Sequence, residues 1–314
     1  MTIAMVARGL LTYVVPRALY NTRPAETASA RYCYAVFMRH LVKVHAACGR
    51  APLGHVAEFG PGGSLGTGLA AVIAGARCYD AVDVRRHSDR DSNLAVFDEL
   101  VDLFARRAPI PTADEFPAIK PALADHSFPA HILDERHMAA ALDKQRLATY
   151  RKAIADDALD GESPISYAAP WYDTPLIARG SIDWIFSQAV LEHVEDLPQF
   201  YRLCASWLAP GGVMSHQIDF KSHGTAPAWD GHRAYSDLTW RMIRGARSYL
   251  INRAPLSMHL DAARDNGFEL IEADVVTTPP TLARAALAPR FRDCTDRDLT
   301  ASGAFVIHRR RSET

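Results

Sequence analysis

The sequence predicts an α/β fold: a doubly wound, mostly parallel sheet of seven strands with helices on both of its faces. Three observations lead to this prediction. Short apolar runs alternate along the chain with segments of helical periodicity. The first of these runs ends in a glycine-rich turn, Gly60-Pro-Gly-Gly-Ser-Leu-Gly66, which opens a segment of helical composition. The chain has 314 residues, of which 48% are hydrophobic, and this is ample for a large core.

Seven short apolar segments are expected to be the strands: 55–60, 78–84, 165–168, 181–187, 212–219, 268–276 and 304–308. The spacing of apolar residues predicts helices over 27–48, 66–75, 94–104, 197–208 and 257–266. Thr27 is expected to cap the first helix, and Asp196 the fourth, where Gln199 completes a capping box. Pro210-Gly-Gly212 is expected to end that fourth helix and to precede the next strand.

Interruptions of the alternation suggest how the chain is organised. Residues 1–50 are expected to form an N-terminal helical cap and residues 51–314 the main domain, with insertions at about 109–163 and 220–256. The first insertion is rich in proline and charge and is expected to hold loops and one or two helices.

Composition and charge exclude several classes of protein. Lys and Arg number 35 against 36 Asp and Glu, and a net charge of −1 argues against a dedicated nucleic-acid binder. No run approaches the roughly 18 uncharged apolar residues of a membrane span. The apolar stretch from Met1 to Pro16 contains an arginine and is expected to be a packed helix rather than a signal peptide. The five cysteines include no CxxC pair, so buried free thiols in a cytoplasmic protein are expected.

The turn after the first strand has the features of a cofactor site. Its glycines let a ligand approach the backbone, and the helix that follows is expected to present unpaired N–H groups. Asp83, roughly 20 residues further on at the end of the second strand, is placed to hold ribose hydroxyls. These features leave a nicotinamide-dependent dehydrogenase open, although Glu58 and the position of Gly66 depart from the Gly-x-Gly-x-x-Gly pattern.

Three motifs lie in order along the chain: Glu58-x-Gly60-x-Gly62, Ser181-Ile-Asp-Trp-Ile-Phe-Ser187-Gln-Ala-Val-Leu-Glu-His193-Val, and Trp207-Leu-Ala-Pro-Gly-Gly212-Val. Together they resemble the motifs of class I S-adenosylmethionine-dependent methyltransferases, and the whole chain is similar to bacterial members that act on saccharides and secondary metabolites. The resemblance implies a Rossmann-like sheet with S-adenosylmethionine as the cofactor.

The resemblance also assigns the cofactor contacts. They fall to nine residues: Glu58, Gly60, Pro61 and Gly62 along the methionine part, Asp83 at the ribose, Ala169 and Trp171 at the adenine, and Ser187 and Gln188 near the sulfonium. Ala169 replaces an acidic residue that is common in the family. For Trp171, a place in the core is an alternative to stacking on the adenine.

The acceptor pocket is expected after the fifth strand, where histidine and aspartate gather. His216 or His223 is expected to be a general base, with Asp219 orienting it and His193 close by. An alternative is a divalent metal held by His216, Asp219, His223 and His232. The leading hypothesis is methyl transfer to a hydroxyl of a small sugar or metabolite without a metal; N-methylation, a dehydrogenase and a non-catalytic interaction module are the alternatives. The sequence does not indicate the oligomeric state.

The first predicted helix carries a further polar group of residues: Arg31, Tyr32, Tyr34, Arg39 and His40. A solvated face is the expected role for these side chains, and contact with an acceptor is the alternative.

Overall fold

A computed structural model of the chain describes residues 2–15, 27, 29–160, 163–172, 174, 176–247 and 250–311. Both ends of the apolar stretch from Met1 to Pro16 lie outside these residues, as do residues 161 and 162 of the first insertion.

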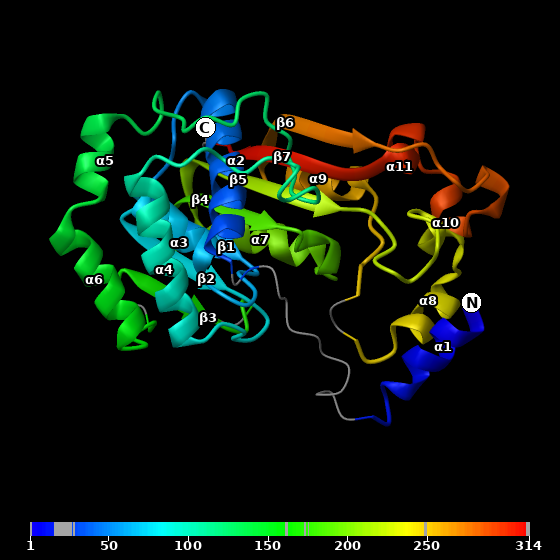
Figure 1. Cartoon of the computed structure of the whole chain (residues 1–314). Coiled ribbons are helices and arrows are strands. Elements are labelled where there is room, and N and C mark those ends of the chain that lie inside the picture. Colours follow the sequence, from blue (N-terminus) through cyan, green and yellow to red (C-terminus); the bar gives the residue numbers. More distant parts are fainter. Residues whose placement is uncertain are drawn as a thin grey trace.

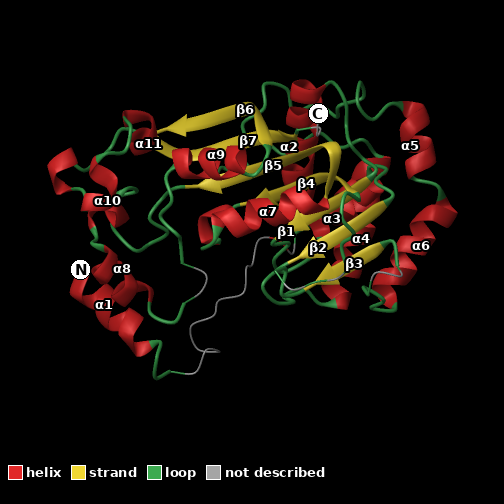
Figure 2. Cartoon of the chain, turned by 180° about the vertical axis from the view of Figure 1, so that it is seen from behind, coloured by secondary structure: helices red, strands yellow, loops and turns green. Residues whose placement is uncertain are grey.

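Within the described residues, one sheet runs through the middle of the molecule (Figures 1 and 2). Its strands are β1 (His55–Phe59), β2 (Cys78–Val82), β3 (Ile165–Ala168), β4 (Ile182–Gln188), β5 (Leu208–Asp219), β6 (Phe268–Thr277) and β7 (Ala301–Arg310). The strand order is β3-β2-β1-β4-β5-β7-β6, and β7 alone of these runs antiparallel to its neighbours. The predicted doubly wound, mostly parallel sheet of seven strands is therefore confirmed. Its order reverses between β1 and β4, and ligands of such sheets bind at that point, beyond the carboxyl ends of the strands.

Helices cover both faces of the sheet, and each face has its own apolar core. One face is covered by α2 (Ala30–Cys48), α3 (Gly66–Ile73), α4 (Arg90–Ala105), α5 (Glu135–Ala141) and α6 (Lys144–Ala155). The other face is covered by α7 (Leu197–Trp207) and α9 (Leu256–Asp265). The first insertion thus holds α5 and α6, as expected.

The start of α2 differs from the prediction. The helix begins at Ala30, and the Ser29 side chain accepts the cap hydrogen bond from the backbone N–H of Tyr32. Thr27 is not its cap, because the Thr27 hydroxyl oxygen instead accepts a bond from the N–H of Gly63, at 2.7 Å. The chain ahead of α2 is thereby fastened to the glycine turn after β1.

Two further differences concern β5 and the thiols. Strand β5 begins at Leu208 rather than at Gly212, because Leu208 pairs with Ile182 across a bulge in the ladder. The α7 helix before it is capped by Asp196, as predicted. All five cysteines are free thiols, but only Cys33 and Cys204 are buried.

Several short elements gather on the side toward which the parallel strands point (Figures 1 and 2). They are α1 (Thr2–Leu11), η3 (Leu191–His193), η4 (Gly231–Ala234), α8 (Asp237–Arg244), η5 (Arg284–Ala286), α10 (Pro289–Arg292) and α11 (Asp296–Thr300). Helix α1 packs on α8, where Gly9 lies directly against the carbonyls of Met242 and Ile243. In the described part of the chain, every helix is too short or too polar to cross a membrane.

Buried histidine makes the stability of this fold depend on pH. Burial lowers the pKa of His308 to about 4, below its usual 6.5. Because the folded-state pKa is lowered, the stabilisation is present above about pH 6.5 and is lost as the pH falls toward 4. We expect His308→Leu to gain about 1–2 kcal/mol of unfolding free energy relative to wild type between pH 7 and pH 5. Urea unfolding at the two pH values measures this. His131→Leu at an exposed position is the control, and an equal wild-type-to-variant difference at both pH values would contradict the prediction.

Candidate functional site

The glycine turn after β1 brings the ends of three strands together. The N–H of Gly60 donates to the carbonyl of Val82 at 2.8 Å, which ties the end of β1 to the end of β2. Gly60 and Gly62 have φ angles of +67° and +75°, which favour glycine, and Pro61 lies buried between them. A Cβ on Gly60 would come within 2.6 Å of a methyl carbon of Val190. The turn therefore passes close to the segment that follows β4.

Gly60→Ala is expected to destabilise the protein and to distort the cofactor site, because it adds both an unfavourable φ and a steric clash with Val190. Gly180→Ala is the matched control, because Gly180 has a φ of +65° but a Cβ added there would meet nothing within 4 Å. We expect a melting temperature lower for Gly60→Ala than for Gly180→Ala, by an amount equivalent to about 1–3 kcal/mol. Equal melting temperatures would show that the contact with Val190 is relieved at no cost.

Four N–H groups of this turn and of the start of α3 are paired within the chain, which differs from the predicted unpaired groups. The N–H of Gly63 donates to Thr27, that of Leu65 to the Asn93 side chain, that of Gly66 to the Ser64 hydroxyl, and that of Gly68 to Glu58. The chain itself therefore satisfies these four amides, which a bound anion could otherwise use.

Glu58 lies beneath α3 rather than open to a ligand. Its carboxylate accepts bonds from the N–H of Gly68 at 3.0 Å and from the hydroxyl of Tyr79 at 2.7 Å. Burial raises the pKa of Glu58 to about 8, although these hydrogen bonds oppose the rise. Glu58 thus connects the first turn of α3 to β2 and supports the glycine turn that lies between β1 and α3.

Asp83 stands at the carboxyl end of β2, as predicted. Its N–H donates to the carbonyl of Ala168, and its carbonyl accepts from the N–H of Trp171 at 2.8 Å, so that β2 and the loop after β3 are tied together. The carboxylate accepts from the N–H of Val84 at 2.6 Å. Burial raises the pKa of Asp83, whereas His87 and the N–H of Gly62 act to lower it. The side chain keeps 11% of its surface exposed, beside the glycine turn.

The two residues after β3 that are predicted to contact the adenine have different surroundings. Ala169 borders the end of β3 next to Asp83, while the Trp171 ring is only 8% exposed. That ring packs edge-on against Phe59 at 5.7 Å and against Phe200 at 6.2 Å. These contacts correspond to the alternative in which Trp171 is a core aromatic.

The last two residues of β4 each contact a buried histidine, one on either face of the sheet. Ser187 lies on the α7 side, with its hydroxyl 2.8 Å from Nδ1 of His216. Gln188 lies on the α2 side, with its Oε1 3.2 Å from Nε2 of His40. His40 in turn lies 2.8 Å from the hydroxyl of Ser215. Each of the two residues predicted to lie near the sulfonium is therefore held in place by a buried histidine on its own face of the sheet.

His216 does not suit the role of a general base. It is fully buried, and burial holds its pKa well below its usual value. Its only bonded neighbour among the described residues is Ser187, and its ring packs on Phe200. Its position within β5, covered by α7, keeps the ring from solvent and from any acceptor.

His223, Asp219 and His193 do come together, at the carboxyl ends of β4 and β5. Nε2 of His223 lies 3.5 Å from a carboxylate oxygen of Asp219, and the rings of His193 and His223 meet edge-on at 5.3 Å. The His223 and Asp219 side chains remain 28% and 26% exposed. This predicted trio therefore faces an accessible region next to the end of β4.

Backbone strain gathers around the same trio. Ala189, which follows Gln188, has a φ of +53°, and His223 has a φ of +46°. Arg253, in the loop before α9, has a φ of +64°. Residues other than glycine are held in this region only where the surrounding structure fixes them, and such positions concentrate at functional sites.

The four residues of the metal alternative do not converge. His216 is buried within β5 under α7, whereas Asp219 is the last residue of that strand and His223 lies beyond it. Among the described residues, no three His, Cys, Asp or Glu side chains are arranged as ligands of one ion. The geometry therefore does not favour the set His216, Asp219, His223 and His232 as metal ligands.

The polar residues of α2 also differ from their expected role. Tyr34, Arg39 and His40 are buried, so most of this group is not a solvated face. The Arg39 guanidinium donates to the carbonyls of Ala35 and Pro111. For His40 the sequence predicts a solvated face, with acceptor contact as the alternative, whereas the structure places its ring against Gln188. The one available signal for its burial was its place among apolar neighbours on the predicted helix.

Comparisons with known proteins match part of the chain to one family. The model of the family described as methyltransferase domain matches residues 127–215, which run through β3, β4 and α7 into β5. The match contains Ser187, Gln188 and His193, but it does not contain the glycine turn or Asp83. No curated protein matches the sequence of the chain.

Solved structures similar to this chain have low sequence identity to it. An S-adenosylmethionine-dependent methyltransferase from Mesorhizobium loti is 14% identical, with a TM-score of 0.42, over 86% of this chain and 96% of that one. A SAM-dependent methyltransferase from Methanosarcina mazei is 11% identical, with a TM-score of 0.41, over 82% and 93%. Phosphoethanolamine N-methyltransferase 2 from Haemonchus contortus, solved with S-adenosyl-L-methionine, is 13% identical, with a TM-score of 0.42, over 90% and 57%.

These likenesses are too distant to assign an activity, and the fold rests on the strand order of the chain itself. That order, with β7 antiparallel between β5 and β6, is the order of the class I methyltransferase sheet. The chain thus has a class I methyltransferase fold, and its residues 127–215 match a methyltransferase domain.

Proposed function

We propose that the protein is an S-adenosylmethionine-dependent methyltransferase that acts on a hydroxyl of a small polar acceptor, of the saccharide or secondary-metabolite kind that its resemblance implies. The matched segment and the sheet support methyl transfer. Asp83, the glycine turn and the pair Ser187 and Gln188 lie around the switch point of the sheet, where the cofactor of such a fold binds.

One observation separates this proposal from a nicotinamide-dependent dehydrogenase. A dinucleotide needs free N–H groups at the start of α3 for its pyrophosphate. Here those of Gly63, Leu65, Gly66 and Gly68 are already bonded within the chain. S-adenosylmethionine carries no phosphate, so a turn of this kind suits it without rearrangement. The paired amides are the observation on which the proposal depends most.

His223 is the residue best placed to remove a proton from a hydroxyl acceptor. Burial alone would raise the pKa of Asp219, but hydrogen bonds from His223 and from the backbone of Lys221 lower it below its usual value. Asp219 is therefore a carboxylate that favours a proton on Nε2 of His223, which leaves the lone pair of Nδ1 for the acceptor. His193 packs edge-on against the His223 ring and fixes its plane.

The cofactor supplies a methyl group that its sulfonium has already activated. The chain then has two tasks: to hold the acceptor oxygen in line with that methyl group, and to receive the proton when the new O–C bond forms. Because Asp219 ends β5 and His223 follows it, while Ser187 and Gln188 end β4, acceptor and cofactor would meet between these two strand ends.

Calorimetric titration of the pure protein with S-adenosylmethionine, and separately with NAD, tests the proposal. We expect micromolar binding of S-adenosylmethionine and none of NAD. Tight binding of NAD would instead indicate a dehydrogenase, and binding of neither would favour an interaction module. Once an acceptor is found, NMR of the product locates the methyl group, and a methyl on nitrogen would replace the hydroxyl acceptor by an amine.

A further inference from the structure

A small buried cavity lies next to Asp219, and no step of the proposed reaction uses it. Glu192 of η3, His232 of η4 and the loop before α9, including Arg253 and Ala254, form its walls together with Asp219. Its volume is about 10 Å³, roughly what one water-sized group needs. A single hydroxyl, amine or water fits such a space, whereas a phosphate or a whole sugar ring does not.

The walls of this cavity carry polar atoms without partners. The Glu192 side chain is 2% exposed, and neither carboxylate oxygen makes a hydrogen bond of normal geometry within the described part of the chain. Nδ1 of His232 and Nε of Arg253 are likewise buried and unpartnered there. A buried polar group without a partner costs roughly 1–3 kcal/mol, and three residues that line this one cavity carry such groups, which favours an occupant that can pair with them.

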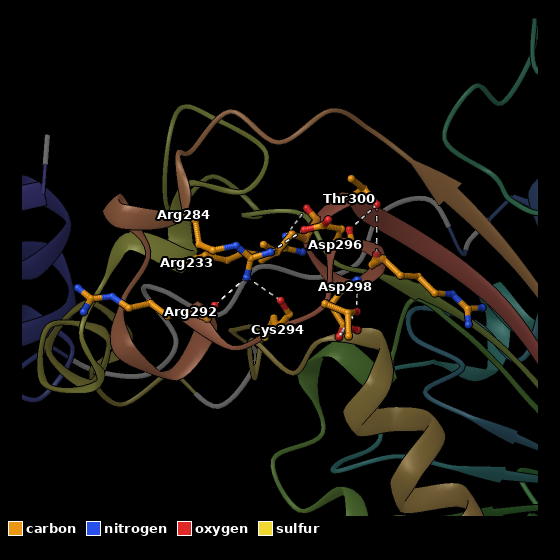
Figure 3. A network of polar contacts seen from close by, with 10 residues as sticks. Arg233, Arg284, Arg292, Cys294, Asp296, Asp298 and Thr300 are labelled. Carbon is orange, nitrogen blue, oxygen red and sulfur yellow. Dashed lines mark hydrogen bonds and ion pairs between the residues drawn. The ribbon is translucent and has the colours of Figure 1, made fainter.

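The nearby guanidinium groups are committed elsewhere. Arg233 donates to the carbonyls of Leu299 and Ala301. Figure 3 shows Arg233 in the polar network to which it belongs. The terminal nitrogens of Arg253 donate to the carbonyls of His232 and Tyr235 and to Asp237. Neither arginine therefore forms an ion pair with Glu192.

The cavity is also rigidly framed. The N–H of Asn252 donates to the carbonyl of Glu192 at 2.6 Å, and the Asn252 side chain donates to the carbonyls of Leu191 and Val194. The loop before α9 is thus fixed to η3. Arg253, whose backbone has a positive φ, is one of the residues that line the cavity. Polar groups held this firmly are suited to recognise a ligand group rather than to rearrange.

The unpartnered atoms select the chemistry of the occupant. Burial raises the pKa of Glu192 well above its usual value and favours the neutral carboxyl group, whose carbonyl oxygen needs a donor. Nε of Arg253 can only donate and needs an acceptor. An ammonium would leave the arginine N–H unpaired, and a carboxylate would face the carboxylate of Asp219. A hydroxyl both donates and accepts, so it satisfies both sides. We propose that this cavity binds a hydroxyl group of the acceptor, beside the hydroxyl that receives the methyl group.

Asp219 connects the cavity to the place of the reacting hydroxyl. Asp219 lines the cavity and also contacts His223, so one hydroxyl in the cavity and another at His223 would belong to neighbouring positions of the acceptor. The acceptor is therefore a polyhydroxylated molecule such as a sugar. Only this link to the reacting hydroxyl rests on the proposed function; the binding of a hydroxyl in the cavity does not.

Saturation-transfer NMR with three small probes tests the inference on the full chain without cofactor. The probes are ethane-1,2-diol, methylammonium and acetate, each at the same concentration. We expect the diol to give the strongest transfer and Glu192→Met to weaken its binding about tenfold, because the hydrogen bond to the buried carboxyl group is lost. Glu195→Met is the matched control, because Glu195 lies three residues away, is 55% exposed and forms an ion pair with Arg244.

A second variant protects the test against loss of folding. Ala254→Leu fills the cavity and leaves Glu192 in place, and it should abolish diol binding while circular dichroism confirms the fold. A stronger signal from methylammonium or acetate, or no diol signal with the wild type, would overturn the proposal. The last result would make the cavity a site for structural water only. Because no cofactor is present, these outcomes are independent of whether S-adenosylmethionine binds.

Discussion

Asp83→Ala is expected to weaken the binding of S-adenosylmethionine by about a hundredfold or more, the largest effect of any single cofactor contact. A carboxylate that accepts from two ribose hydroxyls makes two charge-assisted hydrogen bonds, each contributing about 1.5–3 kcal/mol. The structure holds this carboxylate ready at the end of β2, oriented by the N–H of Val84 and only 11% exposed. Little ordering is then left for the cofactor to impose on the side chain.

Calorimetry of the variant and the wild type measures this effect directly. Asp91→Ala is the control, because the Asp91 carboxylate is 80% exposed and pairs only locally with Arg90. Melting temperatures show whether the variants fold. The assignment of Asp83 to the ribose is wrong if Asp83→Ala binds S-adenosylmethionine within threefold of the wild type while Asp91→Ala behaves normally.

The fold was predictable from the sequence because its signals are local. Short apolar runs such as the one around Val56 and caps such as Asp196 are recognised from a few neighbouring residues, and the mostly parallel, doubly wound sheet follows from the alternation of strands and helices. The errors fell at element ends. Thr27 and Ser29 are both good cap residues, and only the long-range bond from Thr27 to Gly63 decides between them.

The place of a site residue could be predicted from the sequence only where its position along a strand determines it. Asp83 and Asp219 lie at strand ends, so topology alone brings them to the carboxyl edge of the sheet. His216 comes three residues before Asp219, on β5, and its face is set by α7, which no local pattern reveals. The pairing of the turn amides likewise depends on Asn93 and Thr27, which are distant in sequence.

His40 and Glu192 show why burial is the hardest property to infer. Polar residues are usually exposed, so a histidine on a helix was expected to face solvent. In the structure the apolar residues around His40 seal it under the sheet, where it fixes Gln188. Glu192 belongs to a motif recognised in the sequence. The burial of its side chain without a hydrogen-bond partner among the described residues depends on the loop before α9, which is distant in sequence.

Replacement of His223 is expected to have the largest effect on turnover. His223→Gln should lower the methyl-transfer rate about 10²–10⁴-fold, the usual contribution of a general base, and leave the affinity for S-adenosylmethionine within twofold. Asp219→Asn should have a smaller effect, because Asp219 orients the His223 ring and does not itself take the proton. The measurement is the initial rate of S-adenosylhomocysteine formation with an acceptor found by screening, together with calorimetry of each variant.

His216→Gln separates a catalytic histidine from a structural one. Glutamine at 216 can still bond to Ser187 but loses the packing of the ring on Phe200, so its melting temperature should fall while the rate per folded molecule changes little. His131→Ala, at an exposed position, is the control for both. Full turnover in His223→Gln, or a rate loss in His216→Gln with no change in melting temperature, would reverse the roles given to the two histidines. Since His216 is sealed beneath α7 and His223 stands 28% exposed beside Asp219, the geometry favours the first pattern.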